Sequence, residues 1–202
     1  MPRPDARGRR RLDAGTRREA IVAAARAAFA EEPYDDVSVA ALAARAGTSE
    51  ALVYHYFESK GRLYASVLQS EVEELSAGQL AADAALPAGT SRRERVRTAL
   101  EIHLDHVQGA SAVWARHLLG APETQEALTV RRRFRHDYAE RMAELLGLRP
   151  WPRHEYALSG FLGFVDGASL RWRTRGCPDE ERAPLLDAAL GALEGALGDW
   201  GG

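Results

Sequence analysis

Apolar residues recur three or four positions apart along most of this chain. This spacing places apolar side chains on one stripe of an α-helix, whereas a half-buried β-strand requires strict alternation of apolar and polar residues. No alternating stretch of convincing length is present. The sequence therefore predicts an all-α fold.

Capping residues and helix breakers divide the pattern into about nine helices. Ser38 and Ser59 are of the type that caps helix N-termini, and Gly147 is of the type that ends a helix. Pro33 and Pro150 separate neighbouring segments, since proline disrupts a helix interior. The expected helices cover residues 16–31, 38–46, 48–56, 60–80, 91–108, 109–120, 122–147, 153–175 and 179–197.

Composition excludes several classes of protein. Apolar residues make up 46% of the chain, which is enough for a packed core. Cys177 is the only cysteine, so no intrachain disulfide can form and a reducing compartment is expected. No run approaches the roughly 18 consecutive apolar residues of a membrane span, and no secretory signal follows the N-terminus. We therefore expect a cytoplasmic protein with no membrane partner.

Charge is distributed unevenly although its sum is only -2. Residues 1–62 contain 11 basic and 9 acidic side chains, whereas residues 63–202 contain 16 basic and 20 acidic ones. Residues 1–14 are rich in arginine and are expected to form a basic, disordered arm. A basic arm on an acidic body favours contact with a polyanion, and a merely solvated tail is the alternative.

Two short helices around Gly47 form a helix-turn-helix pattern. Glycine suits the turn, and Ala43 and Ala46 are small enough for the two helices to cross closely. Val53 and Phe57 are expected in the core, which leaves the opposite face of the second helix pointing outward, where a DNA major groove would lie. Two helices that pack for purely structural reasons would show the same pattern.

The segment around this pattern resembles the DNA-binding domain of TetR-type bacterial repressors. The resemblance covers residues 17–68 and is strongest in the stretch SEALVYHYFESKGRLY at residues 49–64. Its most specific feature is a tyrosine, a phenylalanine, a lysine and a leucine at three-residue intervals, at Tyr54, Phe57, Lys60 and Leu63. The rest of the chain is similar to the family only in length and helix order.

The resemblance implies a three-helix DNA-binding head over residues 15–62. It implies that Tyr54 and Lys60 meet the DNA backbone, and that residues at the helix starts and on the outer face of the second helix contact phosphates or bases. The implied DNA-binding residues are Ser38, Arg45, Thr48, Ser49, Glu50, Leu52, Tyr54, His55, Tyr56 and Lys60. The second helix lacks Arg, Lys, Asn and Gln, the usual bidentate readers of bases. Glu50 suits the positive N-terminal end of the helix dipole better than it suits a contact with a cytosine amino group.

The resemblance also implies a ligand-binding and dimerisation body over residues 63–202. A single helix-turn-helix reads few base pairs, so a homodimer on a palindromic operator is expected. The implied protein is a repressor that a small-molecule effector releases from double-stranded DNA. The expected interface, for which packing within the chain is the alternative, consists of Gly160, Gly163, Gly167, Leu186, Leu190, Leu193 and Leu197.

Aromatic and histidine residues of the middle helices are expected to line an effector cavity, although each of them also suits an ordinary core. The candidates are His103, Trp114, His117, Leu118, Phe134, Tyr138, Phe161 and Phe164.

The sequence is also compatible with two other functions. His103 and His106 lie three residues apart with His117 downstream, which is compatible with a metal-sensing repressor or a metal-dependent helical enzyme. No phosphate loop, nucleophile elbow or dinucleotide fingerprint is present, so we expect neither an enzyme nor a cofactor. A helical protein-interaction module is the second alternative.

Overall fold

The computed structural model describes residues 14–111, 115 and 124–198. Among these residues there is no β-strand, which confirms the predicted all-α fold. The helix expected over residues 109–120 lies largely outside the described residues. The helices are α1 (Ala14–Glu31), α2 (Val39–Arg45), α3 (Glu50–Phe57), α4 (Lys60–Ala84), α5 (Arg92–Gly109), α7 (Gln125–Leu146), α8 (Pro152–Thr174) and α9 (Asp179–Leu197).

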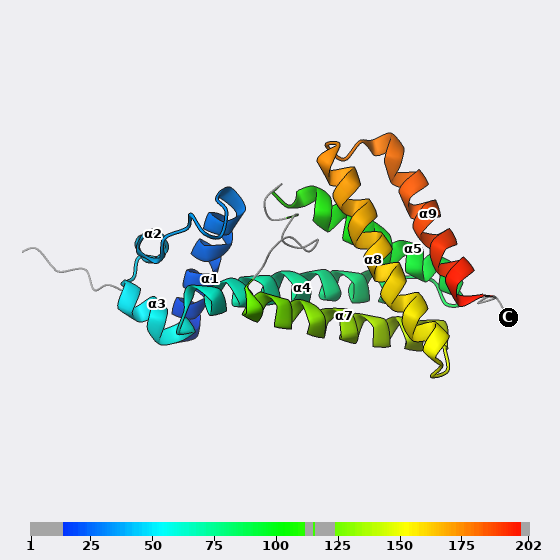
Figure 1. Cartoon of the computed structure of the whole chain (residues 1–202), viewed down its shortest axis with the longest axis horizontal. Helices are drawn as coiled ribbons and strands as arrows, with labels where there is room; N and C mark the ends of the chain where they lie inside the picture. Colours follow the sequence, from blue (N-terminus) through cyan, green and yellow to red (C-terminus); the bar gives the residue numbers. More distant parts are fainter. Residues whose placement is uncertain (1–13, 112–114, 116–123, 199–202) are drawn as a thin grey trace, which may run out of the picture.

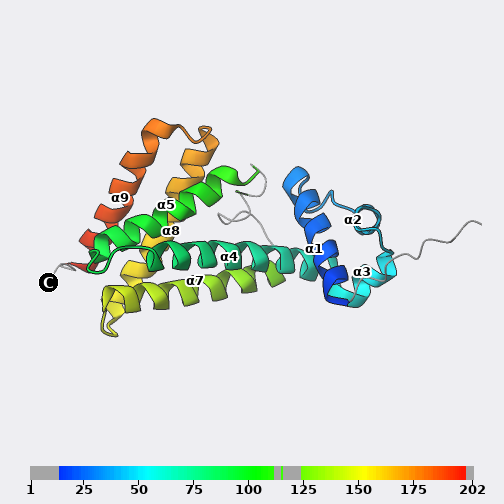
Figure 2. The same cartoon turned by 180° about the vertical axis from the view of Figure 1, so that it is seen from behind.

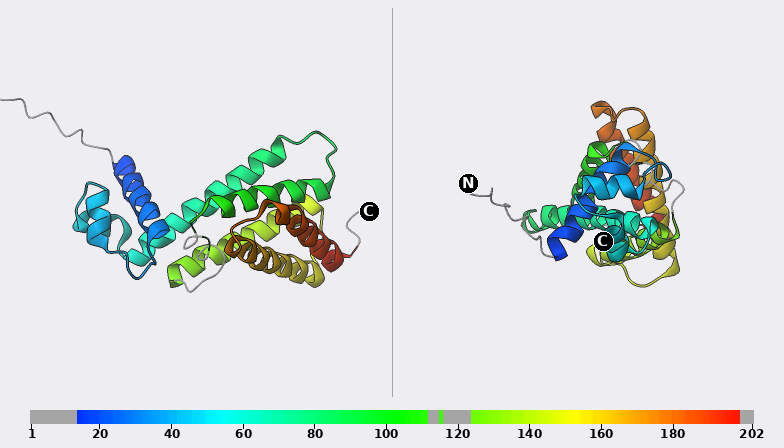
Figure 3. Two further views of the ribbon diagram at one scale, coloured as in Figure 1. Left: turned by 90° about the horizontal axis from the view of Figure 1, so that it is seen from above. Right: turned by 90° about the vertical axis from the view of Figure 1, so that its left-hand side faces the viewer.

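The molecule is elongated, with a small head of α1, α2 and α3 at one end (Figure 1). Helix α4 runs from this head along the body, and α7 lies beside it in the same direction. Helices α5, α8 and α9 complete the body, and α5 runs back along α4 towards the head, as the view from behind also shows (Figure 2). Seen from above, the head extends beyond the body along the line of α4 (Figure 3).

Ser38 and Ser59 begin their helices as predicted, and of Thr48 and Ser49, which both suit the start of α3, Ser49 is the cap. The side-chain oxygens of Ser38, Ser49 and Ser59 accept hydrogen bonds from backbone N–H groups in the first turns of α2, α3 and α4. Gly147 ends α7 with φ +62°, a left-handed conformation that favours glycine. Helix α4 continues to Ala84, beyond the expected end near residue 80.

Two apolar cores are joined by α4. The head core contains residues of α1, α2 and α3 together with Leu63, Tyr64 and Val67 of α4. The body core is formed by α5, α7, α8 and α9. Helix α4 therefore crosses the boundary expected between residues 62 and 63 without interruption. Among the described helices, none combines the length and apolar character that a bilayer span requires.

The leucines of α9 do not form an interface surface, which corrects the expectation for them. They are buried in the chain's own core because α9 uses its apolar stripe to pack against α8 and α5. The residues concerned are Leu186, Leu190, Leu193 and Leu197. In contrast, Gly160, Gly163 and Gly167 of α8 are exposed, and a Cβ added at any of them would meet no atom within 4 Å.

Candidate DNA-binding site and effector cavity

The turn between α2 and α3 depends on Gly47. Its φ of +64° lies in the region that costs an L-residue with a Cβ about 1–2 kcal/mol. The N–H of Thr48 donates to the Ala43 carbonyl over 2.9 Å, which closes the turn. Val53 and Phe57 are buried, as predicted, and fix the inner face of α3.

The outer face of α3 is accessible along its length. Glu50 and His55 are exposed, and 45% of the Tyr54 surface is open to solvent. Leu52 and Tyr56 are only partly accessible, and Tyr56 packs against the head core. The hydroxyl oxygens of Ser38 and Ser49 accept backbone N–H groups, but both side chains lie at exposed helix starts. Thr48 is partly buried beside them.

Lys60, for which a contact with the DNA backbone is predicted, binds backbone carbonyls of the head in this structure. Its ammonium donates to the carbonyls of Tyr34, Asp35 and Val37 over 2.8, 3.4 and 3.0 Å. It also lies 4.4 Å from the centre of the Tyr34 ring. Since an ammonium has three N–H donors, these carbonyls use all of them. Lys60 therefore holds the loop between α1 and α2 in place in this structure.

Two other basic side chains of the head, Arg45 and Arg18, contact residues of the same chain. Arg45 is exposed but pairs with Glu31 over 2.6 Å, and this hydrogen bond raises the pKa of the arginine. The guanidinium of Arg18, which the sequence pattern did not single out, lies 5.1 Å from the centre of the Phe57 ring. The arginine-rich arm of residues 1–13 lies outside the described residues.

A small cavity of about 50 Å³ lies in the body between α4, α5, α7 and α8. Two of the predicted ligand-binding residues, His103 and Phe134, contribute to its wall. The wall combines apolar side chains with charged ones of both signs. The lining residues are Leu68, Glu71, Val72, Leu75, His103, His106, Val107, Arg131, Phe134, Arg135 and Asp166.

Burial controls the charge of this wall. It lowers the pKa of His103 to about 4, with a further contribution from His106, so His103 is neutral at pH 7. Its Nε2 lies 3.2 Å from the Ser169 hydroxyl oxygen. Burial also raises the pKa of Asp166, although Arg135 pairs with this carboxylate and opposes the rise.

Three other predicted ligand-binding residues are not among the side chains that line this wall. Phe161 is buried in the body core, and Phe164, three positions further along α8, is 39% exposed. Tyr138 lines a separate groove of about 260 Å³ beside Gln79 and Arg141. Trp114, His117 and Leu118 lie outside the described residues.

The sequence and fold have known relatives. The family model described as "Bacterial regulatory proteins, tetR family" matches residues 21–67. The HTH-type transcriptional regulator BetI of Rhizobium meliloti is 31% identical over 167 residues, which cover 80% of each chain. The chain belongs to the tetR family.

Further comparisons agree with this assignment. The HTH-type transcriptional activator FasR of Mycolicibacterium smegmatis is 35% identical over 98 residues, which span 48% of this chain and 43% of that protein. A TetR-like transcriptional regulator from Rhodococcus sp. RHA1 has 26% identity and a TM-score of 0.66, covering 94% of this chain and all of the other. The protein is thus a DNA-binding transcriptional regulator, and its relatives are regulators, not enzymes.

Several cavity residues of this tetR-family chain were missed by the sequence reasoning. Glu71 interrupts the apolar stripe that Leu68, Val72 and Leu75 form on α4, and a charged residue in such a stripe was the available signal. Arg131 and Arg135 belong to a basic cluster whose sequence suits a solvated helix face as well as an effector with a carboxylate or phosphate. Within the part of the chain that the structure describes, no three metal-binding side chains gather at one point, so His103 and His106 lack a third candidate ligand there.

Proposed function

We propose that this protein is a homodimeric repressor that binds a palindromic operator through α3 and leaves it when a small molecule occupies the body cavity. The observation that carries the proposal is the accessible face of α3, held behind the Gly47 turn and capped by Ser49. Membership of the tetR family supports the same use of this helix.

In this proposal Tyr54 contacts a phosphate through its hydroxyl, and Glu50 and His55 face the base edges. Ser38, Thr48 and Ser49 lie at the helix starts, where backbone N–H groups also attract phosphate oxygens. Arg45 reaches the DNA by exchanging its Glu31 partner for a phosphate. Lys60 acts indirectly, by fixing the loop that supports α2.

The dimer forms through the exposed small residues of the last two helices. On α8 these are Gly160, Gly163 and Gly167, and on α9 they are Gly191 and Gly195. Each helix-interior glycine costs up to about 1 kcal/mol relative to alanine, and close approach of a second subunit would offset this cost. Two-fold symmetry would present two copies of α3 to one face of the duplex.

The effector proposed here is an anionic amphiphile. The cavity wall offers the guanidinium of Arg135 beside an apolar surface that includes Leu75 and Phe134. An acidic ligand can replace the Asp166 carboxylate at Arg135, because burial makes the charged form of Asp166 unfavourable. A fold neighbour, the regulator FadR of Bacillus subtilis, has been crystallised with stearoyl-CoA. About 50 Å³ holds only one or two water molecules, so entry of such a ligand must expand the cavity.

Selection of bound sequences from random DNA tests the proposal. We expect an inverted repeat whose half-sites are about 10 base pairs apart or a multiple of this, with one dimer per site. Tyr54→Phe should weaken binding to the selected site. Tyr138→Phe, which removes the hydroxyl of a tyrosine on α7 in the body, is the matched control and should leave affinity unchanged. A single unrepeated half-site bound by a monomer would contradict the homodimer.

The effector class has a separate test. Dodecanoate and stearoyl-CoA should raise the thermal midpoint of the protein and weaken its binding to the selected DNA. Dodecanol, which has a similar chain but no negative charge, is the control. Equal effects of dodecanol and dodecanoate would argue against an anionic effector.

A further inference from the structure

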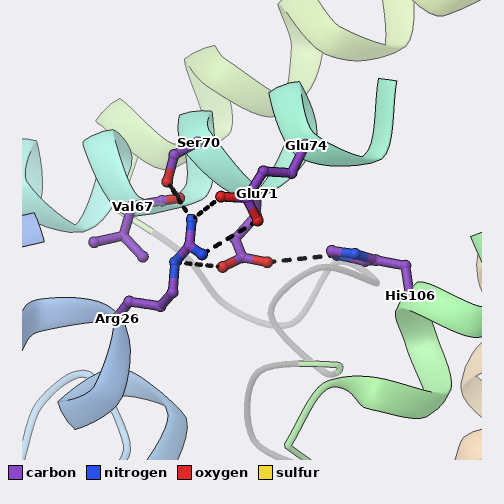
Figure 4. A network of polar contacts seen from close by, with 6 residues as sticks. All are labelled: Arg26, Val67, Ser70, Glu71, Glu74 and His106. Atoms are coloured by element: carbon purple, nitrogen blue, oxygen red, sulfur yellow. Dashed lines mark hydrogen bonds and ion pairs between the residues drawn. The ribbon is translucent and has the colours of Figure 1, made fainter. Parts of the chain in front are cut away.

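A polar network joins the head to the wall of the cavity (Figure 4). Arg26 of α1 places its Nε 2.8 Å from Glu71 Oε1 and donates to Glu74 Oε1 over 2.6 Å. It also donates to the Ser70 hydroxyl oxygen over 2.8 Å. All three partners lie on α4, so this one guanidinium fixes α1 against the middle of the helix that connects the two parts of the molecule.

Glu71 is the buried member of this network. Its side chain is only 9% exposed, whereas that of Glu74 is 56% exposed. Because a buried carboxylate requires a compensating partner, the contact with Arg26 matters more at Glu71 than at solvent-accessible Glu74.

The second oxygen of Glu71 faces the cavity side. Oε2 lies 3.5 Å from Nε2 of His106 on α5. This nitrogen is shielded from solvent and has no hydrogen-bond partner among the described residues, although His106 lines the cavity. An unsatisfied buried nitrogen at a cavity wall is a ready partner for a polar group of a bound ligand.

Arg26 and His106 therefore meet the same carboxylate from opposite sides (Figure 4). They belong to α1 and α5, and the network links them through Glu71. A change in the position or charge of Arg26 or His106 therefore alters the contact between the Glu71 carboxylate and the other residue. The carboxylate is thus a direct polar connection between the cavity and the DNA-binding head.

We propose that Glu71 transmits occupancy of the cavity to the head. A polar ligand group that hydrogen-bonds to His106 draws the imidazole away from Glu71. This movement changes the contact between the Glu71 carboxylate and Arg26, and α1 can then shift along α4. His106 is then the sensing residue and Glu71 the positioning residue for the head. The proposal rests on the proposed function, since it takes the cavity as the effector site.

A mutant cycle on the full-length protein tests this connection without any ligand. Arg26→Gln and His106→Gln are made singly and together, first with Glu71 present and then in the Glu71→Gln background. Hydrogen exchange of the α1 amides and affinity for the selected DNA are measured for each variant. We expect the two substitutions to be coupled by about threefold or more when Glu71 is present and to act independently when it is replaced.

The ion pair of Asp83 with Arg95 provides the matched control. It joins α4 to α5 as the His106 contact does, with a 2.6 Å hydrogen bond, but touches no residue of the head. Asp83→Asn should therefore leave α1 exchange unchanged. If Arg26→Gln does not fold, Arg26→Lys replaces it, because lysine keeps the charge but loses the forked contact with both glutamates.

The outcomes separate the two proposals. Independent effects of Arg26→Gln and His106→Gln with Glu71 present would overturn the role of Glu71, whatever the DNA result. Coupling in α1 exchange would support it even if no repressor activity is found. A protein that responds to no effector, yet shows coupled exchange, would contradict the proposed release mechanism only.

Discussion

The ammonium of Lys60 binds the backbone of the DNA-binding head itself. Its three carbonyl partners belong to the loop between α1 and α2, so the ammonium stabilises the head from within. We predict that Lys60→Met lowers the free energy of unfolding by about 2 kcal/mol, the scale of hydrogen bonds to a charged donor. Chemical denaturation measures this loss.

The salt dependence of DNA binding distinguishes this role from a phosphate contact. Loss of a phosphate contact would reduce the slope of log affinity against log salt concentration by about 0.9 per subunit. Lys60→Met should weaken binding while keeping the slope of the original protein. A reduced slope with unchanged stability would show that Lys60 contacts DNA directly.

His103 makes the stability of the body depend on pH. Its pKa in the folded chain is about 4, below the ordinary histidine value near 6.5, because burial penalises the charged form. Between these values the unfolded chain binds the proton and the folded chain does not, so stability falls as the pH decreases through 6.5 towards 4. Lowering the pH from 7.5 to 5 should cost about 2 kcal/mol through this residue.

A variant that cannot titrate isolates this contribution. His103→Gln should lose less stability than the original protein over the same pH interval, when both are unfolded in denaturant at one protein concentration. Identical pH dependence of the two proteins would mean that His103 is not held neutral by its surroundings.

At the level of helices, local signals were sufficient to predict most ends. Ser38, Ser49 and Ser59 cap their helices, and Gly147 ends α7, because these effects depend on residues within one turn. Which way a side chain faces depends on the partner helix, so local spacing could not predict it. The leucines of α9 illustrate this, since the same stripe suits a dimer interface and an internal core.

The cavity could be predicted only in part for the same reason. His103 and Phe134 were found because aromatic and histidine residues stand out in a sequence. Arg135 and Asp166 were not, since their pairing joins α7 to α8 across 31 residues and becomes visible only when the helices are packed.

The Gly47 turn gives a prediction for the pair α2–α3. Gly47→Ala should destabilise the head by about 1–2 kcal/mol, because the left-handed backbone there crowds a Cβ. Gly47→Asn should cost less, since asparagine tolerates this conformation better than other L-residues. Gly109→Ala, at a glycine with open space around it and no positive φ, is the control. Equal effects of Gly47→Ala and Gly109→Ala on thermal unfolding would contradict the role of the turn.

At the scale of the whole molecule, the head lies at one end of α4 (Figure 1), so in the proposed homodimer the arrangement of the two subunits sets the distance between the heads. Two heads can meet successive turns of one duplex only if the bodies hold them at a fixed separation. The exposed glycines of α8 are central to this argument, because in a single chain nothing prevents larger residues there.

Replacing these glycines therefore tests whether this face of α8 packs against a second subunit. In a lone subunit, Gly163→Ala should stabilise α8 by up to about 1 kcal/mol, since alanine favours the helix. In a dimer that packs closely at this point, Gly163→Leu should shift the protein towards monomers in sedimentation experiments and weaken binding to the palindromic site. Ala77→Leu, which adds a leucine to an exposed position on α4, controls for added apolar surface. If Gly163→Leu leaves the subunits associated and DNA affinity intact, the two-fold contact must lie on another face, and the separation of the heads would have to be set elsewhere.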